Sequence, residues 1–318
     1  MNKYYFSYSE YLKNIFPFKV YKIALDAGFT CPNRDGSAGY GGCIYCDNKS
    51  FSPNSKGERK SVHEQILKGM EFYRKNFNAE RFIVYFQAYT NTYGPVGLLR
   101  ELYDEALSFP DVVGLSIGTR PDCLPDDVLD LLVDYSNKTH LSVEIGLQSM
   151  HNETLRLINR GHNYEQFSDA VMRAKQRGLK ICVHVILGLP GETHEMMMQT
   201  ADALAGSDID GLKIHHLYVA EKTLLEKMYN AGEIKTLALD EYITLVCDFL
   251  ERIPSGVAIQ RLTGELKGEF LIAPEWDVSK RVILSALEKE FARRSTHQGI
   301  LCESKVSCHS ELVSESKI

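Results

Sequence analysis

The octapeptide Lys180-Ile181-Cys182-Val183-His184-Val185-Ile186-Leu187 is the clearest guide to the fold class in this sequence. It is almost continuously apolar and rich in β-branched residues, which is typical of a strand that is buried on both faces. Strands of this kind belong to parallel sheets whose outer face is covered by helices. We therefore predict that the octapeptide is an inner strand of an α/β protein.

Similar β-branched runs lie on both sides of the octapeptide, and they alternate with segments of helical periodicity. The predicted strands are 21–26, 81–86, 112–118, 141–147, 180–187 and 210–217, and the predicted helices lie near 62–77, 96–108, 125–137, 163–177 and 193–205. Strands that alternate with helices imply right-handed βαβ units and a parallel sheet, which either closes most of a barrel or stays flat and doubly wound. In both forms the active site is expected at the carboxyl ends of the strands.

Composition and periodicity divide the chain into four parts. Residues 1–20 form an aromatic-rich segment that we expect to pack across the body of the fold, and residues 21–217 form the alternating core. The pattern changes after this point, so residues 218–297 are predicted to be a small C-terminal extension on the same body. Its predicted elements are helices near 239–252 and 277–294 and a strand at 257–262. Residues 298–318 are rich in Ser, Glu and Lys and contain few apolar residues, which predicts a disordered tail.

The composition is that of an ordinary globular protein, because 44% of the 318 residues are hydrophobic and 25% are charged. The formal net charge of −6 gives no global attraction to nucleic acid. The longest apolar run is far short of the ~20 residues that span a bilayer, and the start of the chain has no apolar signal-peptide region. We therefore expect a cytoplasmic protein whose eight cysteines are thiols or metal ligands.

Three of these cysteines, Cys31, Cys43 and Cys46, lie within sixteen residues directly after the first predicted strand. The glycine-rich segment between the first two can fold back through conformations with positive φ, and the two-residue gap between the last two suits ligands of one metal centre. Three thiolates without a fourth nearby ligand favour a [4Fe–4S] cluster with one open iron over structural zinc. A redox dithiol would leave Cys31 without a role.

Several further motifs follow the predicted strands in order along the chain. They are Thr119-Arg120-Pro121-Asp122, Glu144-Ile145-Gly146-Leu147-Gln148-Ser149, Asn159-Arg160-Gly161-His162, Gly188-Leu189-Pro190-Gly191-Glu192, Arg261-Leu262-Thr263-Gly264-Glu265 and Ala273-Pro274-Glu275-Trp276. Together with the cysteine loop, these motifs resemble the radical S-adenosylmethionine (SAM) superfamily. The long cysteine spacing resembles its YhcC-like subgroup, which is akin to the radical SAM core of the Elongator catalytic subunit. The resemblance implies a partial (β/α)6 TIM-like barrel with a small C-terminal extension.

The resemblance also implies an enzyme whose [4Fe–4S] cluster, held by Cys31, Cys43 and Cys46, binds SAM through its open iron. Reduction of the cluster would cleave SAM to methionine and a 5′-deoxyadenosyl radical, which abstracts hydrogen from a substrate that the sequence does not identify. An RNA base is one candidate for that substrate. The electron would come from an external donor of the flavodoxin or ferredoxin type, and no membrane partner is expected.

Matching positions imply the residues that contact SAM: Tyr45, Gln87, Glu144, Gln148, Arg160, His184 and Gly188. Many relatives have Gly-Gly-Glu at the end of the second strand, where this chain has Phe86-Gln87-Ala88-Tyr89-Thr90, so Gln87 or backbone carbonyls would have to receive the methionine amino group. Arg160 suits a carboxylate, because its guanidinium group can bind bidentately. Glu144 is equally consistent with a structural ion pair, and His184 with a hydrogen-bonded core histidine.

Other interpretations remain open at this point. An electron-transfer or binding protein would use the cluster without SAM, and a zinc-binding module would need no scaffold of this length. Only one of His215 and His216 can face the interior of the barrel, because side chains alternate along a strand. Arg261 and Glu265 are predicted to form an ordinary ion pair, with substrate contacts as the alternative.

Overall fold

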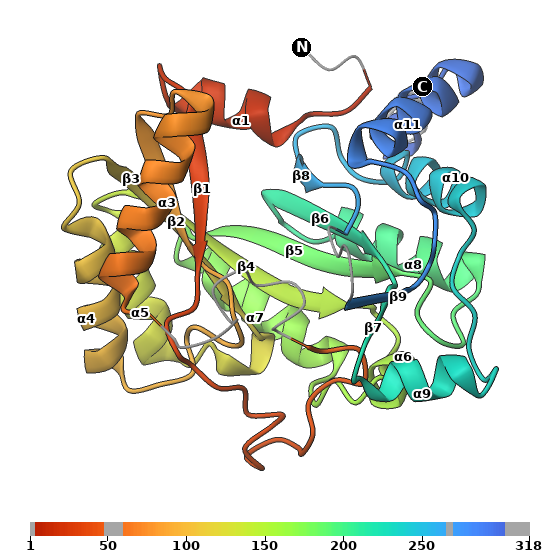
Figure 1. Cartoon of the computed structure of the whole chain (residues 1–318), viewed down its shortest axis with the longest axis horizontal. Helices are drawn as coiled ribbons and strands as arrows, with labels where there is room; N and C mark the ends of the chain where they lie inside the picture. The colour runs from red at the N-terminus through yellow and green to blue at the C-terminus, as the bar shows by residue number, and fades with distance from the viewer. Residues whose placement is uncertain (1–3, 48–59, 265–269, 303–318) are drawn as a thin grey trace, which may run out of the picture.

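The computed structural model describes residues 4–47, 60–264 and 270–302. Its centre is a seven-stranded parallel sheet with the order β1-β2-β3-β4-β5-β6-β8 (Figure 1). The strands are β1 Val20–Leu25, β2 Arg81–Phe86, β3 Val112–Thr119, β4 His140–Gln148, β5 Lys180–Leu187, β6 Gly211–His216 and β8 Ala258–Arg261. Because the order never reverses, right-handed crossovers place the helices on one face of the sheet. The sheet is therefore a partial barrel and not a doubly wound sheet.

The helices that follow the strands cover the outer face of this sheet. Helix α3 packs on β1, α4 on β3, α5 on β4 and α7 on β5. The helices are α1 Tyr8–Ile15, α3 Val62–Phe77, α4 Val96–Leu107, α5 Asp126–Ser136, α6 Asn152–Leu157, α7 Tyr164–Gln176, α8 His194–Ala205, α9 Leu224–Asn230, α10 Leu239–Leu250 and α11 Lys280–Arg294; a 3-10 turn, η1, spans Pro121–Cys123, and a small antiparallel pair joins β7 Val219–Ala220 to β9 Leu271–Ala273. The predicted elements agree with these bounds within three residues, but the short helices α1, α6 and α9 were not predicted.

Local sequence explains where the central helices begin and end. At the start of α3 the hydroxyl of Ser61 accepts from the Glu64 amide (3.2 Å), and the Glu64 carboxylate accepts from the Ser61 amide (2.9 Å). Gly178 follows α7 with a φ of 75°, a left-handed conformation that suits glycine.

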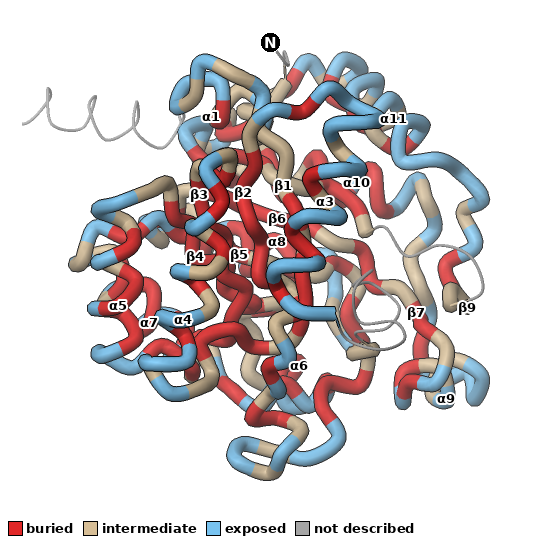
Figure 2. The backbone as a smooth tube through the Cα atoms, turned by 60° about the vertical axis from the view of Figure 1, so that its left-hand side comes forward, coloured by how far each residue is buried: buried red, intermediate tan, exposed pale blue. Residues whose placement is uncertain are grey.

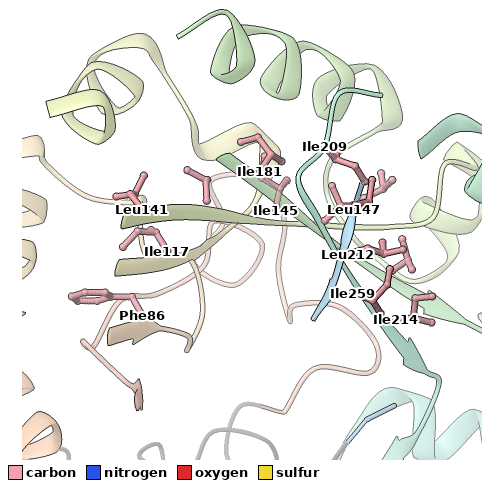
Figure 3. Packing of buried hydrophobic residues seen from close by; sticks show 14 of the residues in the cluster. Phe86, Ile117, Leu141, Ile145, Leu147, Ile181, Ile209, Leu212, Ile214 and Ile259 are labelled. Carbon is pink, nitrogen blue, oxygen red and sulfur yellow. The ribbon is translucent and has the colours of Figure 1, made fainter. Parts of the chain in front are cut away.

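Alternation along the strands gives the sheet an apolar outer face and a polar inner face. Ile181 and Val183 of β5 belong to the main hydrophobic core under the helices, whereas His184 lines a cavity on the opposite face. Figure 3 shows the outer layer, where Ile145 of β4 and Ile181 of the neighbouring strand β5 lie among other apolar side chains. In Figure 2 the strands are mostly buried and exposure is concentrated on the helices around them.

The C-terminal extension continues the same body and adds a strand to the sheet. Strand β8 pairs with β6, so the sheet has seven strands where six were predicted for the core. Helix α11 packs on α10, which packs on α8. The N-terminal segment lies across this edge, because the backbone amide of Ile259 in β8 donates to Phe6 O (2.8 Å) and Tyr4 stacks on Phe291 of α11 with ring centroids 5.7 Å apart.

The disordered tail was predicted to begin too early. Gln298 is 2% exposed, and its side-chain amide donates to the carbonyls of Pro254 (2.7 Å) and Val257 (2.9 Å). These bonds fix residues 298–302 against the body, and the rest of the predicted tail lies outside the described residues. None of the helices in the described ranges is long and apolar enough to cross a membrane.

Candidate active site

A cavity of about 710 Å³ reaches from the cysteine loop at the carboxyl ends of the strands into the barrel. Nine of the ten predicted site residues line it: Cys31, Cys43, Tyr45, Cys46, Gln87, Glu144, Gln148, Arg160 and His184. Gly188 does not. Its φ is 84°, and a Cβ at this position would lie 2.8 Å from Cδ1 of Leu237, so this glycine serves the packing of the turn after β5.

The loop after β1 folds back on itself, as the glycines predicted. The amide of Gly42 donates to Asn33 O (2.8 Å), and the amide of Cys46 donates to Cys43 O (2.9 Å). Gly42 has a φ of 79°, and a Cβ there would lie 2.9 Å from Nε of Arg34. This tight return is what brings Cys43 and Cys46 to the same cavity as Cys31.

The segment 159–162 supports the cysteine loop. The side-chain amide of Asn159 donates to Gly42 O (2.8 Å), and that of Asn33 donates to Asn159 O. Gly161 has a φ of 73°, and a Cβ there would lie 2.6 Å from Oδ1 of Asn33. Glycine is therefore required at position 161 if the two segments are to approach this closely.

Arg160 belongs to this supporting segment and contacts one of the cysteines directly. It is buried, its Nη1 lies 3.6 Å from Sγ of Cys43, and its Nη2 donates to Gly146 O (2.6 Å). Its Nε is buried without a hydrogen-bond partner in the described part of the chain. Arg120, paired with Asp122 at 2.8 and 2.9 Å, donates from Nη1 to Arg160 O (2.6 Å). The motif 119–122 thus acts by positioning Arg160.

A bulge at the end of β4 presents Gln148 to the cavity. The register with β5 shifts between Gly146 and Gln148, and Gln148 has a φ of 79°, which is unusual for a residue other than glycine. A Cβ at position 146 would lie 2.6 Å from Nη2 of Arg160 and 2.7 Å from Nε2 of Gln148. Gly146 therefore allows both side chains to reach the cavity together.

The end of β2 carries Gln87 and Thr90 where the glutamate of many relatives is missing. Both line the cavity. The hydroxyl of Thr90 is buried and has no hydrogen-bond partner among the described residues. Tyr89, with a φ of 62°, holds its ring centroid 5.8 Å from Cζ of Arg34. A hydroxyl without a partner among the described residues thus lies on the same stretch as Gln87, the residue predicted to receive the amino group of SAM.

The thiols lie in a partly buried environment that is flanked by positive charge, with Cys43 buried and Cys31 and Cys46 partly exposed. Burial, followed by the neighbouring Cys43, raises the pKa of Cys46 to about 12, and Arg34 opposes this shift. Burial also raises the pKa of Tyr45 well above its usual value. Within the described ranges, no three His, Cys, Asp or Glu side chains lie close enough to share a single metal ion. In a [4Fe–4S] cluster each cysteine binds a different iron, so its ligands stand further apart.

Glu144 is the centre of a buried ion cluster, which favours the structural interpretation of this residue over a SAM contact. Its carboxylate accepts from Nζ of Lys22 (2.8 Å), from Nζ of Lys213, and from Nε2 of His184 (2.9 Å). Burial alone would raise the pKa of Glu144, yet the ammonium groups of Lys213 and Lys22 hold it well below its usual value. Burial and then Lys213 lower the pKa of His184 to about 4, so this histidine is neutral at pH 7.

The structure separates the two histidines at the end of β6. The ring of His215 lies 6.0 Å from that of His184 inside the barrel. His216 instead packs on Trp276 with ring centroids 4.3 Å apart, and its Nδ1 accepts from the Gly264 amide (3.3 Å). Gly264 and Trp276 therefore hold His216 in place on the cavity wall, whereas His215 is the one that lies against His184 inside the barrel.

Sequence reasoning missed Lys22, Lys213, Asn33 and Thr90, and it gave Arg120 no role. For the two lysines a signal was present. Each stands between outward-facing core residues of a buried strand, Ile23 after Lys22 and Leu212 before Lys213, so alternation alone points both lysines inward. The partners of Asn33 and Thr90 come from distant segments, and no local pattern reveals them.

Comparisons with known proteins identify the family of the chain. The family model of the radical SAM superfamily matches residues 31–204, and that of the radical SAM C-terminal domain matches residues 209–293. The chain is 42% identical to the protein YtqA of Bacillus subtilis over 93% of this chain and 92% of that one. It is 38% identical to YhcC of Escherichia coli K12 over 81% and 82% of the two chains.

A more distant sequence relative and one solved structure extend these comparisons. A tRNA uridine(34) acetyltransferase of Dehalococcoides mccartyi is 27% identical over 60% of this chain and 40% of its own length. The solved structure of Elp3 from the archaeon Methanocaldococcus infernus superposes with a TM-score of 0.68 at 20% identity, covering 88% of this chain and 64% of that one. From its barrel, its cysteine loop and these matches, we conclude that the chain belongs to the radical SAM superfamily.

Proposed function

We propose that the chain is an enzyme that holds a [4Fe–4S] cluster at Cys31, Cys43 and Cys46 and binds SAM beside it. When bound, these cofactors would supply the reductive cleavage of SAM to methionine and a 5′-deoxyadenosyl radical, which abstracts hydrogen from the substrate. One observation carries the proposal. The three cysteines line one cavity together with Arg160, whose buried Nε has no partner in the described part of the protein.

The residues at this end of the cavity suit the cofactors in charge and in hydrogen-bonding capacity. Arg34 and Arg160 lie beside the cysteines, so they would compensate the negative charge of ligating thiolates. Buried polar atoms are nearly always hydrogen-bonded in folded proteins. Nε of Arg160 and Oγ1 of Thr90 are buried, but they have no hydrogen-bond partner among the described residues. The carboxylate and amino groups of SAM offer partners of the required kinds.

We assign the remaining SAM contacts to predicted residues that line the cavity. Gln148 and Arg160 would bind the ribose or the carboxylate, and Gln87 would receive the amino group. Tyr45 would lie against adenine, and His184 would reach the ribose. We do not assign contacts to Glu144, whose carboxylate is bonded within the protein, or to Gly188, which lies off the cavity wall. The task of the chain itself is to orient SAM and to keep water away from the radical.

The substrate and partners are proposed from the relatives. Similarity to a tRNA uridine(34) acetyltransferase suggests an RNA base as substrate. The net charge of −6 means that RNA would have to bind a local basic surface. We further propose an external reductant of the flavodoxin or ferredoxin type, and a cytoplasmic setting, where thiols stay reduced.

Electron paramagnetic resonance (EPR) tests the proposed function. The full chain is reconstituted anaerobically and reduced with dithionite, and spectra are compared with and without SAM. We expect a reduced [4Fe–4S] signal that changes when SAM is added. Cys46→Ala should lose this signal, whereas Cys302→Ala, outside the cavity, should keep it. A signal indifferent to SAM would instead indicate an electron-transfer protein, and bound zinc without iron would indicate a zinc site.

A further inference from the structure

The part of the cavity lined by the middle of β1, β4 and β6 and by the end of β8 carries a surplus of positive charge. Lys22, Lys213 and Arg261 line it, and Glu144 is the one carboxylate among the described residues of the whole lining. Because this carboxylate can balance one of the three cations, two positive charges remain among the described residues of the lining. Lys213 is buried and Lys22 and Arg261 are partly buried, and because removing a charge from water is costly without a counter-charge, the surplus favours an anionic partner.

Arg261 is the cation that the described protein leaves without a partner. Its guanidinium group makes no hydrogen bond or ion pair with any residue in the described ranges, and Glu265, its predicted partner, lies outside them. Arg261 is the last residue of β8 and stands next to Lys213 in the sheet register. After burial, its charge is the next largest cause that lowers the pKa of His215, which places the guanidinium group on the inner face.

Lys213 is held firmly beside it. Its Nζ is bonded to Glu144 and lies 4.4 Å from the ring centroid of Tyr85, and its side chain is 7% exposed. On the other side, Lys22 bonds Glu144 (2.8 Å) and Oε1 of Gln260 (3.2 Å), which links β1 to β8 across the inner end of the barrel. Lys22 and Lys213 are therefore held in place by the protein, and together with Arg261 they form what we call the floor of the cavity.

The proposed cofactors would not remove this surplus. At the cysteine end, Arg120 is already paired with Asp122, while Arg34 and Arg160 face the thiols. SAM brings one carboxylate together with an ammonium and a sulfonium group, so it adds positive charge overall. Among the described residues no second carboxylate lines the cavity, so another molecule would have to supply the negative charge that balances these cations.

We propose that this floor is an oxyanion subsite, in which Arg261 and Lys213 bind a carboxylate or phosphate group of the substrate. The guanidinium fork matches both kinds of oxyanion bidentately, and Lys213 adds a second charged donor. Glu144 and Lys22 act as positioning residues for Lys213. That the ligand is the substrate rests on the proposed function; that the floor binds an oxyanion does not.

Thermal unfolding of the full chain at constant ionic strength tests the subsite. Circular dichroism melts are recorded in chloride, acetate or inorganic phosphate. An anion at ten times its dissociation constant should raise the melting temperature by about 2 °C. A rise with phosphate alone assigns the phosphate class, and a rise with acetate assigns the carboxylate class. No rise with either anion overturns the proposal.

Variants show whether Arg261 causes the anion-dependent rise in melting temperature. Arg261→Gln should weaken anion binding about tenfold, so most of the rise is lost. Arg261→Lys, which keeps the charge but not the fork, should retain part of the rise. Arg293→Gln, on the exposed face of α11 where the side chain is 70% exposed, is the matched control and should retain all of it. An unchanged rise in Arg261→Gln would refute the assignment.

Repeating the melts on cluster-loaded protein with saturating SAM separates this inference from the proposed function. The anion-dependent rise should persist, because SAM would occupy the cysteine end only. If SAM abolishes the rise, the anion had bound at Arg34 and Arg160, and the subsite is refuted. If the protein fails to bind SAM but the rise persists and depends on Arg261, the proposed function fails and the subsite stands.

Discussion

Replacing Glu144 by glutamine should destabilise the protein by about 3–5 kcal/mol, the usual cost of breaking a buried ion pair by removing one partner. The variant keeps the shape of the side chain but leaves two ammonium groups without their counter-charge. The exposed fraction of the side chain is 0% for Glu144, 7% for Lys213 and 20% for Lys22, so Lys213 would have only the neutral water of the cavity in place of the charge of the carboxylate. Neutral His184 cannot replace it either.

This loss corresponds to a measurable change in melting temperature. Unfolding entropies of about 2.1 cal/mol/K per residue imply about 0.7 kcal/mol/K for a chain of this length. The melting temperature of Glu144→Gln should therefore fall by roughly 4–8 °C. Glu288→Gln, an exposed position on α11, is the matched control and should change it by less than about 1 °C.

The loss of stability caused by Glu144→Gln should become smaller as the pH rises. Burial is the main cause that lowers the pKa of Lys213 from 10.5 to about 8, and Glu144 opposes the shift, so the pKa of Lys213 is lower still in the variant. Stability rises with pH wherever the unfolded chain binds more protons than the folded one. The contribution of Lys213 to this increase in stability begins near pH 8 in the wild type and at a lower pH in the variant. The difference between the two melting temperatures should thus be smaller at pH 9 than at pH 6.

Circular dichroism melts of the full chain at both pH values provide the test. Equal melting temperatures for Glu144→Gln and Glu288→Gln would refute the argument that Glu144 neutralises the lysines. The double variant Glu144→Gln with Lys213→Met offers a second check. It should melt higher than Glu144→Gln alone, because it removes one of the charges left without a partner.

Three further predictions concern the two ends of the cavity. Arg160→Lys should retain iron but lose most of the SAM-dependent EPR change, because lysine cannot bridge Cys43 and Gly146 as the guanidinium fork does; exposed Arg156→Lys is its control. Gly161→Ala should reduce the iron content per chain, because its Cβ would lie 2.6 Å from Oδ1 of Asn33. Gly232→Ala, with a φ of 75° and nothing within 4 Å, has the same backbone strain and should keep its iron. The affinity of the subsite for sulfate, whose own charge is constant, should fall as the pH passes about 8, because Lys213 loses its proton there. The titratable and charged groups around Lys213 are Glu144, Lys22, Cys182, Arg261 and His184. An affinity that stays constant from about pH 6 to 9 would exclude Lys213 from the subsite.

The fold was predictable because its strongest signals are local. Each core strand alternates with a helix whose apolar face is visible in the sequence, and periodicity placed these elements within three residues. Strand β8 was predicted, but its pairing with β6 was not, because the sequence of Ala258–Arg261 does not show which strand it meets. The six residues of α6 and the seven of α9 were missed because they are too few to show a helical period.

Only those site residues that belong to sequence motifs could be predicted. The spacing of the three cysteines and the family resemblance gave nine of the residues that line the cavity. The ion cluster depends on pairs that are 122 residues apart for Lys22–Glu144 and 69 apart for Lys213–Glu144. A single sequence shows which way each side chain points, but not which side chains meet.

The two ends of the cavity imply how the proposed enzyme would choose the atom that reacts. An oxyanion fixed at Arg261 and Lys213 and SAM fixed at the cysteine loop leave the substrate to extend along the barrel between them. His184 and His215 lie along this path, and burial lowers the pKa of both, so they add no charge there. Selectivity would then follow from the distance between the anionic group and the reacting carbon, because a substrate of another length would present a different carbon to the radical.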